Sequence, residues 1–173
     1  GDTLLRSLGQ ELGVAVGGAV EGLPSGSPTT LGELGISMGE EGRLGVDAAT
    51  LDEKLLADPD AVRKVFEFNA EVSDPGLAIY QHSNALPSST FEVEKLGDGT
   101  WELRDGTNTI ALDASGNTLK APDGSAYDGL TLFWTGEGEP SGPIDVTATQ
   151  GIADRLYNSL DRAVNGLDGT IQQ

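Results

Sequence analysis

The sequence predicts an α+β fold, in which a small helical unit with a β-hairpin carries an inserted antiparallel β domain. Near both ends of the chain, apolar residues recur every three or four positions, a period typical of amphipathic helices. From residue 77 to residue 149 the period changes to two, and Gly-rich turn sequences separate the apolar runs. We therefore expect a helical unit over residues 1–70, completed by a helix in 150–173, and a β domain over residues 71–149.

The first expected helix covers residues 3–20, because Leu4, Leu8 and Leu12 recur at intervals of four. Asp2 or Thr3 is a suitable cap for its first turn. A row of glycines lies on another face of this helix: Gly9, Gly13 and Gly17. The row is either an accident of a chain with 25 glycines or a smooth surface that a neighbouring helix approaches closely.

A small hairpin is expected next. Ile36 and Met38 suit one short strand, and Leu44 and Val46 suit a second. The acidic, Gly-rich segment 39–42 suits the turn that joins them.

Two short helices follow the hairpin. Asp47 is a suitable N-cap for the first helix, which carries Leu51, Leu55 and Leu56 on one face. Asp58 is a suitable N-cap for the second, and Pro59 takes the first helical position, where a missing N–H costs nothing. The second helix has an apolar stripe made of Ala61, Val62, Val65 and Phe66.

The β domain is predicted from short alternating runs that end at Asp-Gly or Gly-Asn turns. Such runs occur at 77–82, 91–95, 101–104 and 130–134. Short strands at this spacing are typical of an antiparallel meander, a sandwich or a small barrel.

The last expected helix begins near residue 150, where the helical period returns, and Asn165-Gly166 suits its C-cap. We expect this helix to pack against the first one. The expected helical core is Leu4, Leu8, Leu12, Ile152, Leu156 and Leu160. The short helices should pack onto it through Leu51, Leu55, Val62 and Phe66. A β domain inserted between these helices needs its two ends close together in space.

Composition and charge exclude several function classes. The chain has 28 acidic and 10 basic residues and a net charge of −18, so phosphate backbones and anionic lipid surfaces repel it. We therefore expect no nucleic-acid and no membrane partner. The absence of cysteine excludes disulfides, thiolate metal sites and cysteine nucleophiles. No apolar run approaches the ~20 residues of a transmembrane helix, and the first residues lack the pattern of an ordinary signal peptide.

The sequence contains no recognisable catalytic constellation. His82 is the single histidine, so it cannot belong to a multi-histidine metal site, and no Ser-His-Asp spacing surrounds it. Carboxylates such as Asp98, Asp105 and Asp123 follow turn chemistry rather than a calcium-loop pattern. We therefore expect no enzyme activity, no cofactor and no metal site.

Aromatic residues of the β domain have two interpretations. They either pack in its core or line a surface that binds a sugar or a protein. Phe133 and Trp134 are adjacent, so in a strand they face opposite sides. The candidate exposed aromatics are Tyr80, Trp101 and Trp134.

Three consecutive segments share their order and spacing with a known family. They read Leu-Gly-Glu-Leu-Gly-Ile at 31–36, Gly-Arg-Leu-Gly-Val-Asp-Ala-Ala-Thr-Leu-Asp at 42–52 and Leu-Ala-Asp-Pro-Asp-Ala-Val-Arg-Lys-Val-Phe at 56–66. This order resembles the C-terminal half of the flagellar filament-cap family, also called hook-associated protein 2 or FliD. Segments 1–8 and 149–156 resemble the helices that flank this stretch in the family. The β domain carries no family motif that we recognise.

The resemblance implies a structural protein of bacterial motility. Members of the family form an oligomeric ring at the tip of the flagellar filament, through which exported flagellin is folded and inserted. The implied partners are flagellin, the hook–filament junction proteins and other copies of the full-length parent, which carries coiled-coil ends. The implied location is extracellular, since members of the family are secreted and lie at the tip of the filament. We expect this chain to be a fragment of a longer parent and to be monomeric by itself.

A second hypothesis is that the β domain is an adhesion module, which recognises a glycan, a host surface or a neighbouring protein. It is compatible with the first hypothesis, because a protein exposed at a filament tip can also adhere. Binding of the 71–149 segment to a glycan array would distinguish an adhesion module from a pure scaffold.

Overall fold

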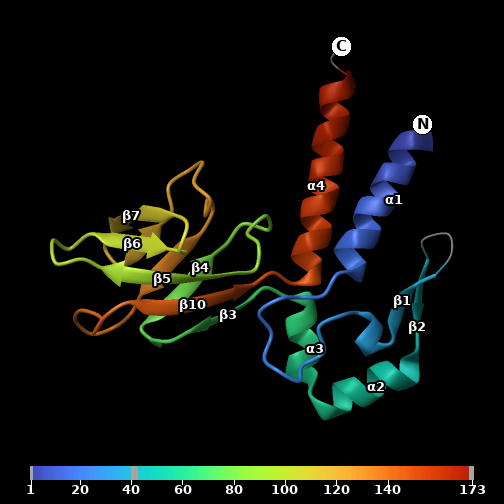
Figure 1. The fold of residues 1–173 in the computed structure, drawn as a ribbon, viewed down its shortest axis with the longest axis horizontal. Coiled ribbons are helices and arrows are strands. Elements are labelled where there is room, and N and C mark those ends of the chain that lie inside the picture. The colour runs from blue at the N-terminus through green and yellow to red at the C-terminus, as the bar shows by residue number, and fades with distance from the viewer. Residues whose placement is uncertain (1, 40–42, 172–173) are drawn as a thin grey trace. The chain divides into compact units, whose positions relative to one another are not determined.

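The computed structural model describes residues 2–39 and 43–171. Within these ranges, side chains are described except at residues 2–5, 7–8, 163–164 and 166–171. The chain divides into two compact units: residues 1–69 with 150–173, here called the helical unit, and residues 70–149, here called the β unit. The α+β prediction is confirmed (Figure 1).

The helical unit combines helices with one small hairpin. In chain order its described elements are α1 (Asp2–Gly17), a 3₁₀ turn (Gly32–Leu34), β1 (Ile36–Met38), β2 (Leu44–Val46), α2 (Ala48–Ala57), α3 (Pro59–Phe66) and α4 (Ile152–Ile171). Helix α1 packs against both α4 and β1, and in Figure 1 it lies between α4 and the hairpin.

Local signals set the helix boundaries as predicted around the hairpin. The side chain of Asp47 accepts hydrogen bonds from the N–H groups of Ala49 and Thr50, so it caps α2. The Asp58 carboxylate accepts from the Ala61 N–H at 2.9 Å, and Pro59 stands in the first turn of α3.

The ends of the two long helices differ from the predictions. Helix α1 ends at Gly17 rather than at residue 20. Helix α4 continues to Ile171, so the predicted C-cap at Asn165-Gly166 is wrong. The physical reason is that Leu167 and Ile171 extend the apolar period beyond Gly166, and one glycine inside a helix costs only about 1 kcal/mol.

The hairpin pairs antiparallel, with Ile36 opposite Val46, Ser37 opposite Gly45 and Met38 opposite Leu44. Side chains alternate along a strand, so the four large apolar residues share one face, and Ser37 and Gly45 occupy the other. The predicted hairpin is confirmed, and its predicted turn at 39–42 lies mostly outside the described residues.

The core of the helical unit gathers residues from α1, the loop after it, α3 and the start of α4. Its buried members are Val16, Val20, Leu31, Leu34, Val62, Val65 and Ile152. Leu23, Ile36, Leu51, Phe66 and Leu156 pack against them from the edge.

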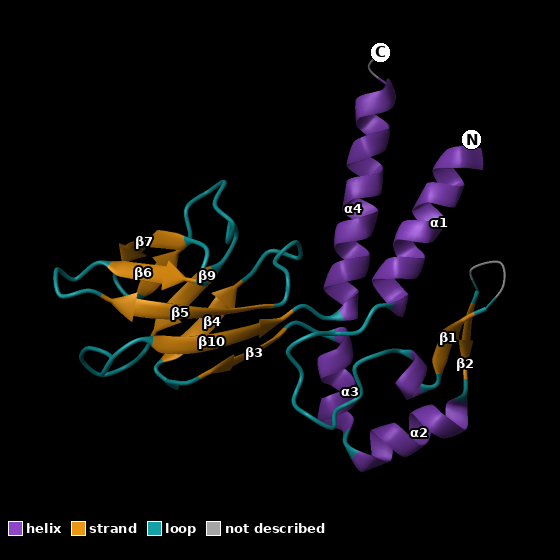
Figure 2. Ribbon diagram, in the orientation of Figure 1, coloured by secondary structure: helices purple, strands orange, loops and turns teal. Residues whose placement is uncertain are grey.

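The β unit is one antiparallel eight-stranded sheet that nearly closes into a barrel (Figure 2). Its strands are β3 (Asn69–Val72), β4 (Leu77–Gln81), β5 (Ser89–Lys95), β6 (Trp101–Arg104), β7 (Thr109–Ser115), β8 (Thr118–Lys120), β9 (Thr131–Trp134) and β10 (Ile144–Thr149). They are ordered β3-β10-β5-β6-β7-β8-β9-β4. Of the three expected arrangements, the structure is therefore closest to a small barrel.

Alternation along the strands fills the barrel. Phe91 and Val93 of β5 are buried, and so are Ile144 and Val146 of β10, whereas Glu92 and Asp145 between them are exposed. The strand β3 was not expected, because its sequence Asn-Ala-Glu-Val is short and polar. It is held by the Ser73 N–H, which donates to the Asp145 carbonyl oxygen at 2.9 Å, and by the Asp145 N–H, which donates to the Ser73 hydroxyl.

Candidate functional site

The chain leaves the helical unit and returns to it at one narrow crossing. Gly151, just before α4, lies against the backbone carbonyls of Phe66 and Glu67, which end α3. A β-carbon at position 151 would overlap both carbonyl oxygens, so only glycine allows this approach. The α4 helix also starts here, since the Arg155 N–H donates to the Gly151 carbonyl oxygen.

Arg155 joins α4 to the end of α1. Its guanidinium donates to the carbonyl oxygens of Gly18 at 2.9 Å and Ala19 at 3.1 Å. A β-carbon at position 18 would lie 2.9 Å from the Arg155 Nη1 atom, so Gly18 makes room for the guanidinium. Burial lowers the pKa of Arg155. Sequence reasoning missed this residue, because an isolated arginine in a helix is usually solvent-exposed.

A groove of about 520 Å³ runs between α1 and α4. It is lined by Gln10, Val14 and Gly18 on one side and by Arg155, Asn158 and Arg162 on the other. The groove is open, and the described residues around it include no nucleophile–base pair.

The residues predicted to form the helical core are only partly brought together. Ile152 and Val62 are buried in the core, while Leu51, Phe66 and Leu156 pack at its edge and Leu12 is half-buried. Leu160 is 47% exposed, so placing it in the helical core was wrong. Leu55 and Leu56 are 41% and 87% exposed, so the prediction that this face of α2 packs onto the core through Leu55 is wrong too. The apolar stripes of α2 and α4 are wider than the surfaces that cover them. Leu4 and Leu8 lie in the α1 backbone, but their side chains lie outside the described set.

The hairpin leaves an apolar face uncovered. Ile36 packs against the edge of the helical core, but Met38, Leu44 and Val46, on the same face, are exposed. Exposed apolar side chains gathered on one face mark interaction surfaces more often than isolated ones do.

Two of the three predicted exposed aromatics are in fact buried. Trp101 and Trp134 pack against each other inside the β unit, with ring centroids 5.8 Å apart. The expectation that they are exposed is corrected here, because they alternate with the outward-facing Glu102 and Phe133 and so point inward. Tyr80, the third, is exposed on β4 beside the irregularity between Ile79 and Gln81.

A turn carboxylate organises one end of the barrel. Asp105 accepts hydrogen bonds from the side-chain amide and the N–H of Asn108, from the Thr107 N–H and from the Tyr127 hydroxyl. The side-chain amide of Asn108 has the largest effect on the pKa of Asp105. Together these hydrogen bonds hold that pKa well below its ordinary value. Burial raises the pKa of Tyr127 to about 12, and its ring meets Phe91 edge-on at 5.1 Å. The contact between Asp105 and Tyr127 is therefore structural. A carboxylate that stays ionised and a phenol with a raised pKa are unsuited to proton transfer near neutral pH.

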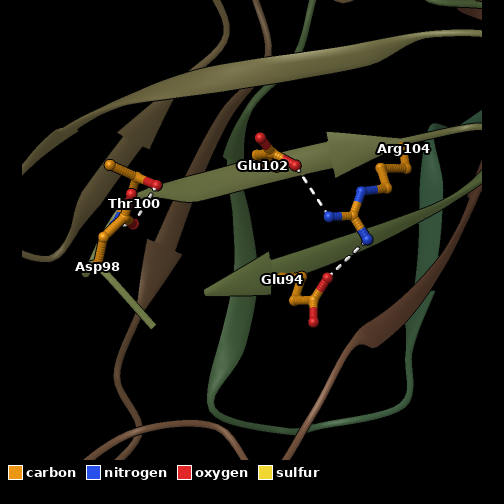
Figure 3. Close-up of polar contacts among 5 residues, drawn as sticks. All are labelled: Glu94, Asp98, Thr100, Glu102 and Arg104. Carbon is orange, nitrogen blue, oxygen red and sulfur yellow. Dashed lines mark hydrogen bonds and ion pairs between the residues drawn. The ribbon is translucent and has the colours of Figure 1, made fainter. Parts of the chain in front are cut away.

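Neighbouring strands β5 and β6 carry a second polar network on their outer face (Figure 3). Arg104 donates to Glu94 at 2.7 Å and to Glu102 at 2.9 Å, and both carboxylates raise its pKa. In the turn between these strands Asp98 accepts from the Thr100 N–H and hydroxyl. The network pairs opposite charges across strands and has the character of sheet stabilisation.

A shallow pocket of about 360 Å³ lies beyond the end of the β4–β9 ladder. Its lining mixes polar and apolar residues: Ser83, Ala85, Leu86, Ser125, Ala126, Asp128 and Gly129. Gln81 pairs with Thr131 in the last register position of that ladder, so the pocket begins two residues beyond the pair. Tyr80 precedes Ser83, the first residue of the pocket, by three positions in the chain and is not itself among the lining residues.

Metal and membrane chemistry find no support in the described part of the chain. Among those residues no group of three or more His, Cys, Asp or Glu side chains is placed to hold a metal ion. Within residues 2–39 and 43–171, no helix combines the length and hydrophobicity that crossing a bilayer requires.

Comparison with known proteins gives one result. The family model described as flagellar hook-associated protein 2 C-terminus matches residues 1–173. The match therefore extends through the β unit, where we recognised no family motif in the sequence. Searches of the curated proteins and of the solved structures returned no match.

Proposed function

Because the chain belongs to the flagellar hook-associated protein 2 family, a family of structural proteins of the flagellar filament cap, we propose that it promotes flagellin folding and insertion at the filament tip. The family match along the whole chain is the observation that carries this proposal. The predicted segments at 31–36, 42–52 and 56–66 lie in the scaffold of the helical unit, which supports a role in assembly rather than in catalysis.

The proposed partners follow from this role. They are flagellin, the hook–filament junction proteins and other copies of the full-length protein arranged in a ring, with the working location outside the cell at the filament tip. The strongly acidic composition is suited to that exposed position, because a net charge of −18 favours solubility. We propose that the isolated chain sediments as a monomer.

Complementation of a bacterial strain that lacks its own filament-cap gene tests the function. The full-length protein should restore long filaments and reduce the unpolymerised flagellin that leaks into the medium. The matched control carries Arg155→Met, which removes the contacts of α4 with Gly18 and Ala19 but leaves the β unit untouched. Unchanged leakage with the wild-type protein, expressed and exported at normal levels, would refute the proposed role.

A second candidate function concerns the β unit, which we propose binds a neutral glycan. The specific observation is Tyr80, which is 77% exposed and lies three positions before Ser83 in the chain, a residue that lines a pocket with Ser125 and Asp128. An exposed aromatic face stacks on a sugar ring, and hydroxyl and carboxylate groups form hydrogen bonds with sugar hydroxyls. Neutral sugars are favoured because acidic ones meet a chain of net charge −18.

A glycan array probed with the whole chain tests this candidate. Signals on neutral glycans should disappear with Tyr80→Ala and weaken with Asp128→Asn. Tyr157→Ala is the matched control, because it removes an exposed tyrosine from the helical unit and should leave the signals unchanged. An array without signal, or one in which both tyrosine variants lose binding equally, contradicts glycan recognition by the β unit.

A further inference from the structure

The hairpin and helix α2 form a continuous arm in which no described side chain is buried. The arm comprises residues 36–39 and 43–57, and strand β2 runs into α2 through the single residue Asp47 (Figure 1). Of the ten large apolar side chains that are exposed in the described part of the chain, five belong to the arm: Met38, Leu44, Val46, Leu55 and Leu56. Exposed apolar side chains are therefore concentrated here, which is typical of an interaction surface.

Helix α2 receives little cover from its own unit. It has ten residues, and none of them is buried. The Asp47 side chain caps its first turn, and Leu51 packs at the edge of the helical core. Helices shorter than about 12–15 residues are marginal in water unless neighbouring elements cover them. The outer face of α2 therefore belongs to the less stable part of the fold and gains order when a partner covers it.

The outer face of α2 combines an apolar anchor with two carboxylates. Leu56 is 87% exposed, and Asp52 and Glu53 precede it by four and three residues, so the three side chains are neighbours on the helix surface. Among the described residues, neither carboxylate takes part in an ion pair or a side-chain hydrogen bond. Asp60 of α3, by contrast, is paired with Arg63.

Charge indicates the chemistry of the partner that fits this face. The sequence from residue 36 to residue 57 contains five acidic and two basic residues, and the whole chain has a net charge of −18. A cationic segment is attracted by the two carboxylates at short range and by the whole chain at long range. A second copy of the chain brings the same negative charge and is repelled.

We propose that the outer face of α2 is a docking surface for a basic amphipathic polypeptide segment. Apolar side chains of that segment cover Leu55 and Leu56, and its lysines or arginines pair with Asp52 and Glu53. The inference does not rest on the proposed cap function, and it uses neither the β unit nor the groove between α1 and α4. One face of a ten-residue helix supports a weak, transient contact rather than a permanent one.

The contact should weaken as ionic strength rises. Surface ion pairs are screened by salt, whose Debye length is about 10 Å at 0.1 M. A contact carried by apolar burial alone would keep its affinity or gain some. The salt dependence therefore reports the contribution of Asp52 and Glu53.

An NMR titration of the whole chain with synthetic peptides tests the proposal. The probe is a helix-forming peptide of leucine and lysine with leucine along one face, and the comparison peptide carries glutamate in place of every lysine. The lysine peptide should shift the backbone amide signals of residues 44–57 and slow hydrogen exchange in α2. The glutamate peptide should do neither.

Variants locate the binding face. Leu56→Ala should weaken binding of the lysine peptide by about tenfold, and Asp52→Asn combined with Glu53→Gln should weaken it by about threefold or more. Both variants keep the fold, because the substituted side chains are exposed. The matched controls should bind like the wild type. Val14→Ala shortens an exposed apolar side chain of α1, and Asp113→Asn with Glu137→Gln removes two exposed charges from the β unit.

Four outcomes overturn the inference. The first is that the lysine peptide causes no shifts in residues 44–57. The second is that the glutamate peptide binds equally well, which shows that charge does not select the partner. The third is that the β-unit charge control loses as much affinity as the α2 variant, which shows attraction to net charge alone. The fourth is that raising the concentration of the chain by itself shifts the same signals, which shows that a second copy covers the face.

Discussion

Replacing Gly151 by alanine should destabilise the helical unit and leave the β unit unchanged. The added β-carbon would overlap the carbonyl oxygens of Phe66 and Glu67, and backbone atoms cannot rotate away as a side chain can. Over-packing of this kind costs about 1–3 kcal/mol, and we take about 2 kcal/mol as the expected loss. With a urea dependence of roughly 1–3 kcal/mol per molar, the unfolding midpoint of the helical unit should fall by about 1 M.

Two optical probes separate the units in the same sample. Both tryptophans, Trp101 and Trp134, belong to the β unit, so tryptophan fluorescence follows its unfolding alone. Far-UV circular dichroism is dominated by helices α1–α4, which all belong to the helical unit. In the Gly151→Ala variant the dichroism midpoint should therefore move and the fluorescence midpoint should stay.

Gly9→Ala is a matched control with the opposite sign. Gly9 lies inside α1, and apart from its chain neighbours and the adjacent helix backbone no described atom lies within 4 Å of the position that an added β-carbon would take, so alanine brings helix propensity without overlap. The helical unit should gain up to about 1 kcal/mol. An unchanged dichroism midpoint for Gly151→Ala, or equal shifts of both probes, would refute the close crossing as we describe it.

Three further predictions concern single contacts. Arg155→Met should lower the stability of the helical unit by about 1–2 kcal/mol in the dichroism assay, because two hydrogen bonds to backbone carbonyls are lost. An unchanged dichroism midpoint would show that these two hydrogen bonds do not stabilise the unit. Trp101→Ala should cost the β unit about 3–5 kcal/mol by the fluorescence of Trp134, and a cost under about 1 kcal/mol would contradict its burial. Asp105 has a lower pKa in the folded than in the unfolded state, so its contribution is fully present above about pH 4 and is lost as the pH falls toward the folded pKa. Acid titration of β-unit stability should accordingly be shallower in Asp105→Asn than in the wild type, and identical curves would exclude this carboxylate as an acid-sensitive group.

The helix–hairpin–helix order was predictable because its signals are local. Asp47, Asp58 and Pro59 act on the residues beside them, and the period of the apolar positions fixes which residues share a face. Local signals do not show how much of each apolar stripe is covered by a neighbouring element of the fold. Leu55 and Leu160 belong to correct stripes and still face water, because no described element covers that part of α2 or α4.

The interior of the β unit was less predictable. Alternation shows that Phe133 and Trp134 point to opposite sides but not which side is inside, and that choice depends on how the sheet curls. The curvature brings Trp101 of β6 onto Trp134 of β9, strands that are not neighbours in the sheet. Arg155 was missed for a related reason, since its acceptors on Gly18 and Ala19 are distant in sequence.

The neighbouring positions of β3 and β10 in the sheet have a consequence for how such chains diversify. Strand β3, which leaves the helical unit, and strand β10, which returns to it, are neighbours in the sheet. Gly151 lies against the backbone of Phe66 and Glu67, so the chain segments just before β3 and just after β10 are also close together. A genetic deletion or exchange of the segment between them therefore has to bridge only a short gap. We therefore expect that a reporter or epitope inserted in place of this segment leaves the helical unit able to fold.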